Sequence, residues 1–470
     1  MLLIFIQQSA FPNFGIMSIS ALLKKHGHNA DLLIISEEKS IIAKLKTLKP
    51  DVVGIHSITG EHNWALSLAK DVKAAGFSTL LGGPHATYYP EETIIKDGVD
   101  MLVVGEAEYT CLELLNNLRD KKDISAIQNL WLKDPSGKII KNELRCLIED
   151  LDSLPSPDRE IYYKYSFLGK ASVKQFLTGR GCPYDCTFCS NHLLSKMYKG
   201  KGKYIRRVSP KIIIDEMKAV RKKWGFRTAS FTDDVFVMSN EWLDEFLPLY
   251  KKEIGVPFMC NVRVNLVTEE LVKKLKSHGC YGVAMGIESG NEDLRNRVLK
   301  KRISNDEIME AGHLIKRNGL KLKAFNMLGL PGETFEQAME TLEINIKIRP
   351  DFTPVSLLEP YPKYEITDYA ISKGYLDKSY CLDDVSGSIY VPSKIAIMDR
   401  DKIINLQSFF FLAVKFPIFL PVIVKLVNYK PNAFYKLLTK VIYGYYMSRV
   451  HRLTLRDIIR YALHIDATQV

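Results

Sequence analysis

Three cysteines in a short loop constrain this chain more than any other feature of its sequence. Cys182, Cys186 and Cys189 follow a C-x3-C-x2-C spacing, and the Gly and Pro residues around them favour a loop. Three thiolates at this spacing can bind one face of an iron–sulfur cube. The next cysteine along the chain is Cys260, so no nearby cysteine completes the set. The fourth iron is then open to an external ligand, which makes the loop a candidate site of chemistry.

Zinc and a disulfide are the alternatives for these cysteines. Zinc sites more often pair a C-x2-C with a second C-x2-C or with an H-x3-5-H, and neither follows here. His192 could still supply a fourth zinc ligand. A disulfide would leave one of the three thiols over. The spacing therefore favours an iron–sulfur cluster over both.

An aromatic residue, Phe188, stands directly before the last cysteine. With this residue the stretch resembles the signature of the radical S-adenosylmethionine (SAM) enzymes. The resemblance implies a 4Fe-4S cluster whose open iron chelates the amino and carboxylate groups of SAM. It also implies an electron donor such as a reduced flavodoxin or a ferredoxin-like protein.

Residues 1–125 alternate short apolar runs with amphipathic helical patterns. Strands are expected at residues 2–6, 30–35, 51–56, 78–81 and 100–104, with helices at 15–25 and 64–75. This rhythm predicts a doubly wound parallel sheet, in which ligands bind at the carboxyl ends of the strands. Residues 126–171 are expected to form a hairpin followed by a Pro-rich linker.

Loops that contain glycine follow three of these strands, at residues 57–60, 82–85 and 105–106. Each loop alone fits ordinary turn chemistry, but three at one sheet edge favour a ligand site, because glycine lets a ligand approach the backbone closely. Ser57-x-Thr59 and Gly82-Gly83 resemble the cobalamin-binding domain. The cobalt-ligating His of that domain is absent after the first strand, as in the subfamily that couples cobalamin to radical SAM chemistry.

The second resemblance implies a set of cobalamin contacts at this edge of the sheet. They are Asn13, Phe14, Ser57, Thr59, Gly60, Gly82, Gly83, Pro84, His85, Gly105 and Glu106. His85 is a candidate for the nucleotide tail or its phosphate, with a structural hydrogen bond as the alternative. His56, inside a strand, is expected to be a satisfied core residue.

Residues 172–375 repeat the strand–helix alternation in longer units, with six expected strands. Six strands fall short of the eight that close a barrel, so a partial (β/α)6 barrel with one open side is predicted. The basic loop at residues 196–207 is expected to be solvated, with docking of an acidic reductant or cover for the cluster as alternatives.

Polar residues and glycine follow the strands of this second region. Arg263 can bind a carboxylate through its planar fork, and the acidic side chains can accept hydrogen bonds from ribose hydroxyls or an amino group. Each of them alone could instead form a strand-end salt bridge. The resemblance implies SAM contacts at Phe188, Asp233, Asp234, Arg263, Gly286, Glu288, Ser289 and Leu330.

The formal charge of +11 is concentrated in the last part of the predicted helical segment 376–470. Residues 401–470 carry ten Lys and Arg against three Asp, a net charge of +7. Basic charge beside apolar residues predicts an anionic surface or ligand, but no nucleic-acid motif accompanies it, so nucleic acid is not an expected partner. Helices expected at residues 434–446 and 453–463 could cap the open side of the barrel or lie on a membrane surface.

Eight cysteines and no secretory signal predict a reducing compartment, the cytoplasm, with membrane association as the alternative that the C-terminal segment raises. Together the resemblances imply a cobalamin-dependent radical SAM enzyme. It would abstract hydrogen from an unactivated carbon of a small, hydrophobic substrate and transfer a methyl group from methylcobalamin. The alternatives are cyclisation or rearrangement without methyl transfer, a radical SAM enzyme without cobalamin, and a non-catalytic cobalamin- or iron–sulfur-binding protein.

Overall fold

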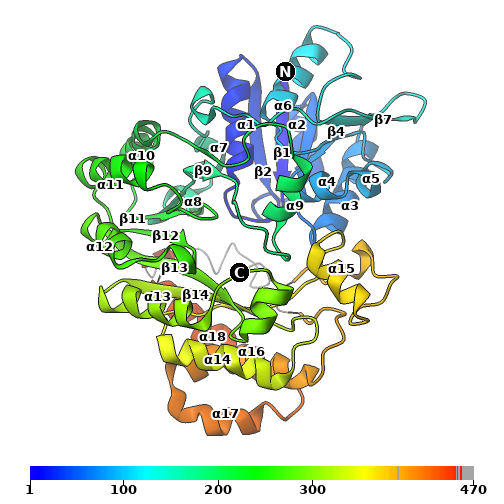
Figure 1. The fold of residues 1–470 in the computed structure, drawn as a ribbon. Coiled ribbons are helices and arrows are strands. Elements are labelled where there is room, and N and C mark those ends of the chain that lie inside the picture. Colours follow the sequence, from blue (N-terminus) through cyan, green and yellow to red (C-terminus); the bar gives the residue numbers. More distant parts are fainter. Residues whose placement is uncertain (389–390, 451, 454–455, 458–470) are drawn as a thin grey trace. The chain divides into compact units, whose positions relative to one another are not determined.

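The computed structural model describes residues 1–388, 391–450, 452–453 and 456–457. The chain divides into two compact units (Figure 1). Of the described residues, the first unit holds 1–171 together with 198–206, and the second holds 172–197 and those from 207 to 457. Each unit has a mainly parallel sheet with helices packed on it, so the α/β fold class predicted from the sequence is confirmed.

The first unit has one seven-stranded sheet in the order β2-β1-β3-β4-β5-β6-β7. Its strands are β1 (Leu2–Gln7), β2 (Asn29–Ile34), β3 (Val52–His56), β4 (Thr79–Gly82), β5 (Met101–Val103), β6 (Leu130–Lys133) and β7 (Ile139–Lys141). Its helices are α1 (Phe14–Lys25), α2 (Ile41–Leu48), α3 (His62–Ala74), α4 (Pro84–Tyr88), α5 (Pro90–Ile94), α6 (Glu108–Arg119), α7 (Glu160–Tyr163) and α8 (Ser166–Gly169). β2 and β3 lie on opposite sides of β1, so the loops after β1 and β3 flank the point where the strand order reverses. Open α/β sheets bind ligands at this point.

The hairpin predicted near residue 135 adds two antiparallel strands to the same sheet. β6 pairs with β5, with Trp131 opposite Leu102, and β7 pairs with β6. The local turn residues specify a hairpin, but they do not specify which sheet it joins. Burial of Leu130 and Leu132 holds it against β5.

Residues 198–206 pack on the first unit, although they follow the cysteine loop in the sequence. The buried Tyr198 hydroxyl accepts a hydrogen bond from the backbone N–H of Glu106 at 3.0 Å. The carboxylate of Glu106 pairs with Arg206 at 2.9 Å and accepts from the backbone N–H of Ile148 at 3.0 Å. Tyr198 and Arg206 therefore anchor the two ends of the segment 198–206. The prediction that the basic loop is solvated is wrong at these two residues.

Tyr198 also occupies the space that a side chain at Gly105 would need. A Cβ there would meet the Tyr198 hydroxyl and lie 2.9 Å from its Cζ atom, at a φ of +84°. We expect Gly105→Ala to lower the free energy of unfolding by about 2–3 kcal/mol, because it adds overpacking to backbone strain. Gly137→Ala is the matched control for urea denaturation, because Gly137 has a φ of +86° and nothing within 4 Å of its Cβ position. Equal losses in the two variants would contradict the packing argument.

The second unit has a six-stranded parallel sheet in the order β15-β14-β13-β12-β11-β8. Its strands are β8 (Val173–Phe176), β11 (Thr228–Phe231), β12 (Phe258–Val262), β13 (Cys280–Glu288), β14 (Lys321–Leu328) and β15 (Val355–Leu357). The helices before residue 400 are α9 (Ser190–Met197), α10 (Pro210–Trp224), α11 (Asn240–Glu253), α12 (Glu269–Ser277), α13 (Asn305–Arg317), α14 (Phe335–Ile348) and α15 (Glu365–Ser372). Each strand pairs with the next one in this order, and β8 and β15 are the outer strands, so the barrel is incomplete, as predicted.

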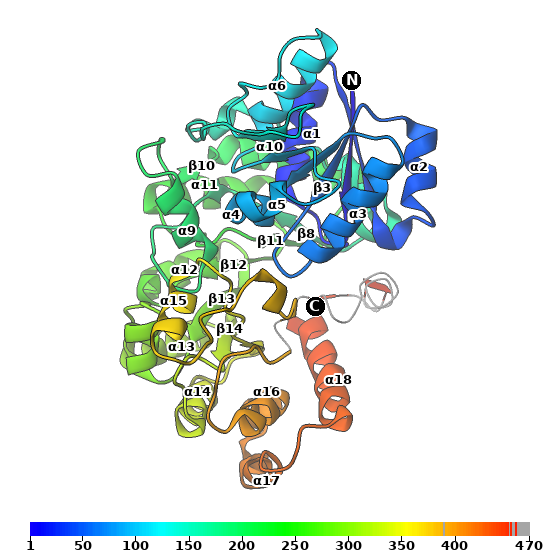
Figure 2. The same cartoon turned by 90° about the vertical axis from the view of Figure 1, so that its right-hand side faces the viewer.

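Helices α16 (Arg400–Lys415), α17 (Leu420–Leu426) and α18 (Ala433–Val450) continue the second unit, with a short 3-10 turn, η6 (Pro417–Phe419), between the first two (Figure 2). α16 buries Phe409 and Phe410 in a cluster with residues of α14 and β15. The side-chain amide of Gln407 donates to the carbonyl of Val355 at 3.1 Å, so α16 covers the edge strand of the sheet. Most of the helix predicted at residues 453–463 lies outside the described residues.

None of the described helices has both the length and the apolarity that crossing a membrane requires.

Candidate active site

The cysteine loop leads directly into α9, and its thiols are at least partly buried. Cys186 is buried and Cys182 and Cys189 are of intermediate exposure, and none of them forms a disulfide. Burial, with the nearby Asp234 carboxylate, raises the pKa of Cys182 to about 11. Iron binds thiolates, so a cluster here would form with release of protons.

Among the described residues, no group of three or more His, Cys, Asp or Glu side chains is arranged to hold a single metal ion. A mononuclear site requires its ligands to converge on one point, whereas each thiolate of a cubane binds its own iron. His192, the candidate fourth zinc ligand, instead places its Nε2 atom 3.1 Å from the Glu365 carboxylate. Three thiols on one loop without a fourth fit a cluster with one open iron.

The segment after the π-helical turn η4 (Leu294–Val298) holds the cysteine loop in place. Thr187 donates its hydroxyl to the carbonyl of Val298 at 2.7 Å and its backbone N–H to the carbonyl of Leu299 at 3.2 Å. Arg302 forms a two-pronged ion pair with Asp185, at 2.8 and 2.7 Å. The loop therefore has fixed anchors on both sides of Cys186.

A buried ion pair lies at the end of β13, and sequence reasoning identified only its acidic member. Lys301 donates to the Glu288 carboxylate at 2.8 Å and to the carbonyl of Gly286 at 2.6 Å, with side-chain exposures of 7% for Lys301 and 12% for Glu288. Arg263 donates to the backbone carbonyl of Lys301, and its guanidinium carbon lies 3.6 Å from the ring centroid of Tyr184. Lys301 stands in a run of basic residues that normally indicates solvent exposure, so no local signal marked it.

These two cations act on Cys186, one of the three loop cysteines. Burial raises the pKa of Cys186, while the positive charges of Lys301 and Arg263 lower it. A positive field beside a thiolate stabilises its charged form. The same field would favour a ligand carboxylate near the open iron.

The backbone of Glu288 is unusual for a strand. Its φ is +71°, and the register between β13 and β14 shifts between Gly286 and Glu288. Such a bulge re-aims a side chain at the end of a strand, and a left-handed non-glycine residue stores strain that often marks functional sites. Here it directs Glu288 onto Lys301.

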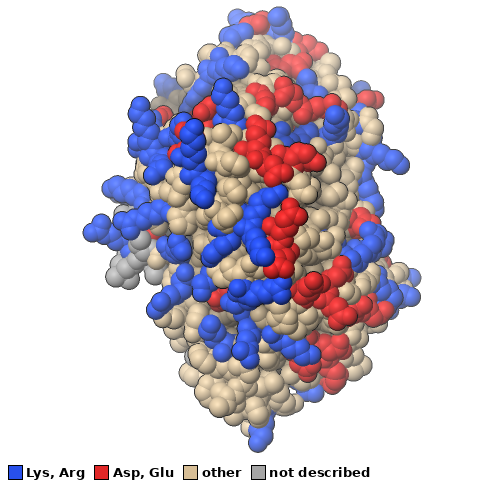
Figure 3. All heavy atoms as spheres, turned by 60° about the vertical axis from the view of Figure 1, so that its left-hand side comes forward, with Lys and Arg blue, Asp and Glu red and all other residues tan. Residues whose placement is uncertain are grey.

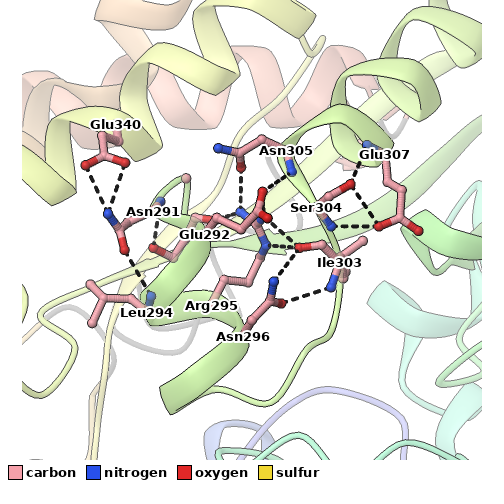
Figure 4. A network of polar contacts seen from close by, with 12 residues as sticks. Asn291, Glu292, Leu294, Arg295, Asn296, Ile303, Ser304, Asn305, Glu307 and Glu340 are labelled. Carbon is pink, nitrogen blue, oxygen red and sulfur yellow. Dashed lines mark hydrogen bonds and ion pairs between the residues drawn. The ribbon is translucent and has the colours of Figure 1, made fainter.

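A fully buried arginine organises the segment between Ser289 and Asn305 (Figure 4). Arg295 donates to the carbonyl of Ser289 at 2.7 Å, to the carbonyl of Ile303 at 2.9 and 2.7 Å, and to the side-chain oxygen of Asn305 at 2.9 Å. The chain therefore closes a loop between the end of β13 and the start of α13, and Lys301 lies within that loop.

Loss of this arginine should be costly. Arg295→Leu leaves the Ser289 carbonyl without this donor and removes two of the three donors to the Ile303 carbonyl, so we expect the free energy of unfolding to fall by about 2–4 kcal/mol. Arg297→Leu is the matched control, because the Arg297 side chain is 55% exposed and its ion pair with Asp293 is worth less than about 1 kcal/mol. Urea denaturation of both variants measures the difference, and a loss below 1 kcal/mol in Arg295→Leu would contradict the network.

The remaining predicted SAM residues are placed differently from one another. Asp233 is buried and its carboxylate accepts from the Thr178 N–H at 3.1 Å and the Thr178 hydroxyl at 2.7 Å, so its oxygens are already engaged. Asp234 is exposed and bonds the side chain of Asn191. Ser289 and Leu330 are buried, and Phe188 packs against a buried hydrophobic cluster.

Glu333 closes the Gly-Leu-Pro-Gly-Glu loop after β14. One of its oxygens accepts from the backbone N–H groups of Gly329 and Leu330, at 2.6 and 3.2 Å. Burial raises the pKa of Glu333 to about 8. Its other oxygen is buried and has no hydrogen-bond partner among the described residues. In the sequence this glutamate follows a Gly-Leu-Pro-Gly turn with no sign of its role, and only its burial distinguishes it.

In the first unit, the loops after β3 and β4 lie side by side. Ser57 donates its N–H to the carbonyl of Gly82 at 2.8 Å and accepts from the N–H of His85 at 3.0 Å. The hydroxyl of Ser57 is buried and has no partner among the described residues, and a Cβ at Gly82 would meet nothing within 4 Å. A donor without a partner beside open space fits a ligand that approaches the backbone here.

The candidate histidines of this edge are satisfied within the protein. Asn13 accepts from the N–H of Ile16 at 3.0 Å through its side-chain oxygen, so its amide nitrogen donates to Nε2 of His56 at 2.9 Å. Burial lowers the pKa of His56 to about 4, and the prediction of a satisfied core residue is confirmed. His85 lies 3.2 Å from the hydroxyl of Thr59, and its ring stacks on that of His62 with centroids 4.5 Å apart.

The other predicted cobalamin residues fall into two groups: those in the loops after β3 and β4, and those that contact other parts of the protein. Pro84 begins α4 after Gly83, where a φ of +100° and a Cβ contact of 2.8 Å to the Ser57 carbonyl permit only glycine. Gly60 lies in the loop after β3, and its N–H lies 3.3 Å from Nδ1 of His62. Three residues face protein instead: Gly105 and Glu106 against Tyr198 and Arg206, and Phe14 beneath the guanidinium of Arg159.

Comparison with known proteins finds two families in this chain. Residues 176–344 match the radical SAM superfamily and residues 8–115 match the B12 binding domain. An uncharacterised methyltransferase of Pyrococcus horikoshii is 28% identical over 376 residues, which cover 78% of this chain and 80% of the relative. The anaerobic magnesium-protoporphyrin IX monomethyl ester cyclase of Rubrivivax gelatinosus is 28% identical over 373 residues, 75% of this chain and 65% of the relative. The structure of the radical SAM methyltransferase TsrM from Kitasatospora setae shares the fold, with a TM-score of 0.64 at 16% identity over 79% of this chain and 76% of that one.

Proposed function

Because the chain belongs to the cobalamin-dependent radical SAM enzymes, whose cofactors are a 4Fe-4S cluster, SAM and cobalamin, we propose that it methylates an unactivated carbon of a small, hydrophobic molecule. The observation that carries the proposal is the presence of both family matches in one chain. The radical SAM match has three thiols on one loop, and the B12-binding match has a buried serine hydroxyl beside open space. A relative named as a methyltransferase supports methyl transfer as the outcome.

The residues of the second unit would hold the cluster and SAM. Cys182, Cys186 and Cys189 would bind three irons, and the positive charges of Lys301 and Arg263 would attract the SAM carboxylate. Glu288, paired with Lys301, would accept hydrogen bonds from the SAM amino group or ribose. The chemistry that the cofactors supply when bound is reductive cleavage of SAM to methionine and a 5′-deoxyadenosyl radical, and donation of a methyl group from methylcobalamin.

The residues of the first unit would hold the nucleotide tail of cobalamin. The Ser57 hydroxyl would donate to the nucleotide tail, and Gly82 and Gly83 would let the tail approach the backbone. The Nε2 atom of His56 is engaged by the Asn13 amide, and burial lowers the pKa of His56 to about 4. Burial and exclusion of water would protect a radical from side reactions.

We place the enzyme in the cytoplasm, because its cluster thiolates need a reducing compartment. Its electron would come from a reduced flavodoxin or a ferredoxin-like protein. The exposed Lys196 of α9, close behind the cysteine loop in the sequence, suits an acidic donor.

The test is product analysis of the anaerobically reconstituted protein with cluster, cobalamin, a strong reductant and SAM labelled with a CD3 methyl group. We expect 5′-deoxyadenosine, labelled methylcobalamin and S-adenosylhomocysteine by mass spectrometry. If protein that retains cluster and cobalamin forms none of these three products, it is a non-catalytic binding protein. Protein that binds no cobalamin yet forms 5′-deoxyadenosine would indicate radical SAM chemistry without that cofactor.

A cyclase is the second candidate, favoured by the 28% identity to a relative named as a cyclase. Cyclisation needs the 5′-deoxyadenosyl radical but no methyl donor. The same experiment separates the two, since 5′-deoxyadenosine without any S-adenosylhomocysteine or labelled methylcobalamin would favour the cyclase and contradict methyl transfer.

A further inference from the structure

Exposed apolar side chains gather at the C-terminal end of the second unit. Of the sixteen large hydrophobic residues that are exposed in the described part of the chain, twelve lie from Val391 onward. Phe416, Ile418, Phe419 and Val422, here called the apolar tip, lie between the end of α16 and the middle of α17 and are 41–82% exposed. Exposed apolar groups concentrated in this way mark an interaction site rather than chance exposure.

Helix α18 continues this pattern with an exposed apolar stripe, formed by Phe434, Leu437, Val441 and Tyr445 and 53–67% exposed. The spacing of three and four residues puts the stripe on one side of the helix. A different side carries Ile442 and Tyr446, which pack against the cluster that holds Phe411. The helix is therefore anchored to the unit by one face and presents a second apolar face outward.

The Lys and Arg side chains of residues 402–456 give this region a positive charge. Residues 402–456 contain nine Lys and Arg and no Asp or Glu. Lys415, Lys425 and Lys430 are exposed and border the apolar tip in the sequence. In Figure 3 the lower end of the molecule, where α17 lies in Figure 1, is tan with a blue side chain and no red.

The exposed apolar side chains and the positive charge together indicate which kind of partner binds this surface. A second copy of the chain would bring two positively charged surfaces together, which costs free energy. An anionic lipid surface instead offers negative headgroups to the lysines and an apolar layer to projecting Phe, Ile and Val side chains. Aromatic residues such as Phe416, Phe419 and Tyr445 are enriched at that depth of a bilayer.

We propose that the apolar tip and the α18 stripe dock the protein on an anionic membrane surface, with Lys415, Lys425 and Lys430 at the lipid headgroups. The side chains enter the interfacial layer without crossing it. This docking does not depend on the reaction that the enzyme catalyses, so it goes beyond the proposed function.

The test is sedimentation of the full-length, cluster- and cobalamin-loaded protein with two kinds of vesicle, pure phosphatidylcholine and phosphatidylcholine with 30% phosphatidylglycerol. We expect binding to the anionic vesicles that weakens as salt is raised. Ile418→Gln combined with Phe419→Gln should weaken binding at least tenfold, because it removes the inserting side chains. The matched control is Ile95→Gln, since Ile95 is 62% exposed in the first unit.

Two further variants separate the parts of the surface. Lys415→Gln, Lys425→Gln and Lys430→Gln together should weaken anionic-vesicle binding about a hundredfold at low salt. Leu437→Gln with Val441→Gln should weaken it without changing the circular dichroism spectrum. The proposal is overturned by absence of vesicle binding, by tip variants that bind like the control, or by a dimer in size-exclusion chromatography that the tip variants dissociate.

Discussion

Cys186→Ser should abolish both assembly of the iron–sulfur cluster and formation of 5′-deoxyadenosine from SAM. Cys186 is the most buried of the three loop cysteines, and a serine hydroxyl is a far weaker ligand for iron than a thiolate. Iron and sulfide content, the visible absorbance of the cluster and the electron paramagnetic resonance signal of the reduced protein measure assembly. Mass spectrometry measures the nucleoside, which should fall below detection.

The chain provides matched controls for this substitution. Cys146 and Cys381 are exposed and lie outside the loop, so Cys146→Ser and Cys381→Ser should keep a full cluster and full activity. Cys182→Ser and Cys189→Ser should reproduce the loss. A cluster that survives in all three loop variants, or zinc instead of iron in the unaltered protein, would exclude the loop as the ligand set.

Lys301→Met should weaken SAM binding by at least a hundredfold and lower the free energy of unfolding by about 3–5 kcal/mol. The side chain keeps its length but loses the charge, which leaves the Glu288 carboxylate buried without its cation. One cation beside the expected carboxylate of SAM is then also missing. Equilibrium binding of SAM to the cluster-loaded protein and urea denaturation measure the two effects separately.

A double variant distinguishes a structural role of Lys301 from a role in binding. Lys301→Met with Glu288→Gln replaces a charged pair by two neutral groups, so stability should largely return. SAM binding should stay weak, because neither charge is restored. Lys300→Met is the control, since the Lys300 side chain is 41% exposed and pairs with Glu365 away from Glu288. If binding recovers together with stability, Lys301 only supports the fold.

Features that depend on neighbours along the chain were predictable. The limits of helices α10 and α11 have local signals in the sequence, because Ser209–Pro210 and Ser239 mark their starts and Gly225 and Gly255 follow their ends. The parallel strands of both sheets followed from the alternation of short apolar runs with amphipathic helices. The cysteine loop was recognisable for the same reason, since its three thiols lie within eight residues.

Features that depend on residues far apart in the chain were not predictable. In the sequence, Lys301 belongs to a basic run that is expected to be exposed. In the structure, the loop closed by Arg295 places Lys301 at the end of β13. The loop at Gly105 and Glu106 resembles a ligand-binding turn until Tyr198 and Arg206, about a hundred residues later, occupy it. Asp233 resembles a strand-end ligand until Thr178 engages its oxygens.

The spacing of a few residues was thus enough to indicate the cluster, the two cofactor-binding folds and the class of chemistry. Which charged side chains lie beside the cluster, which strand-end loops remain open to a ligand and which helix faces stay exposed became visible only in the folded chain. The physical reason is that burial and pairing of a charge depend on partners that the fold brings together, and a carboxylate or ammonium group has a different energy in water and in a protein interior.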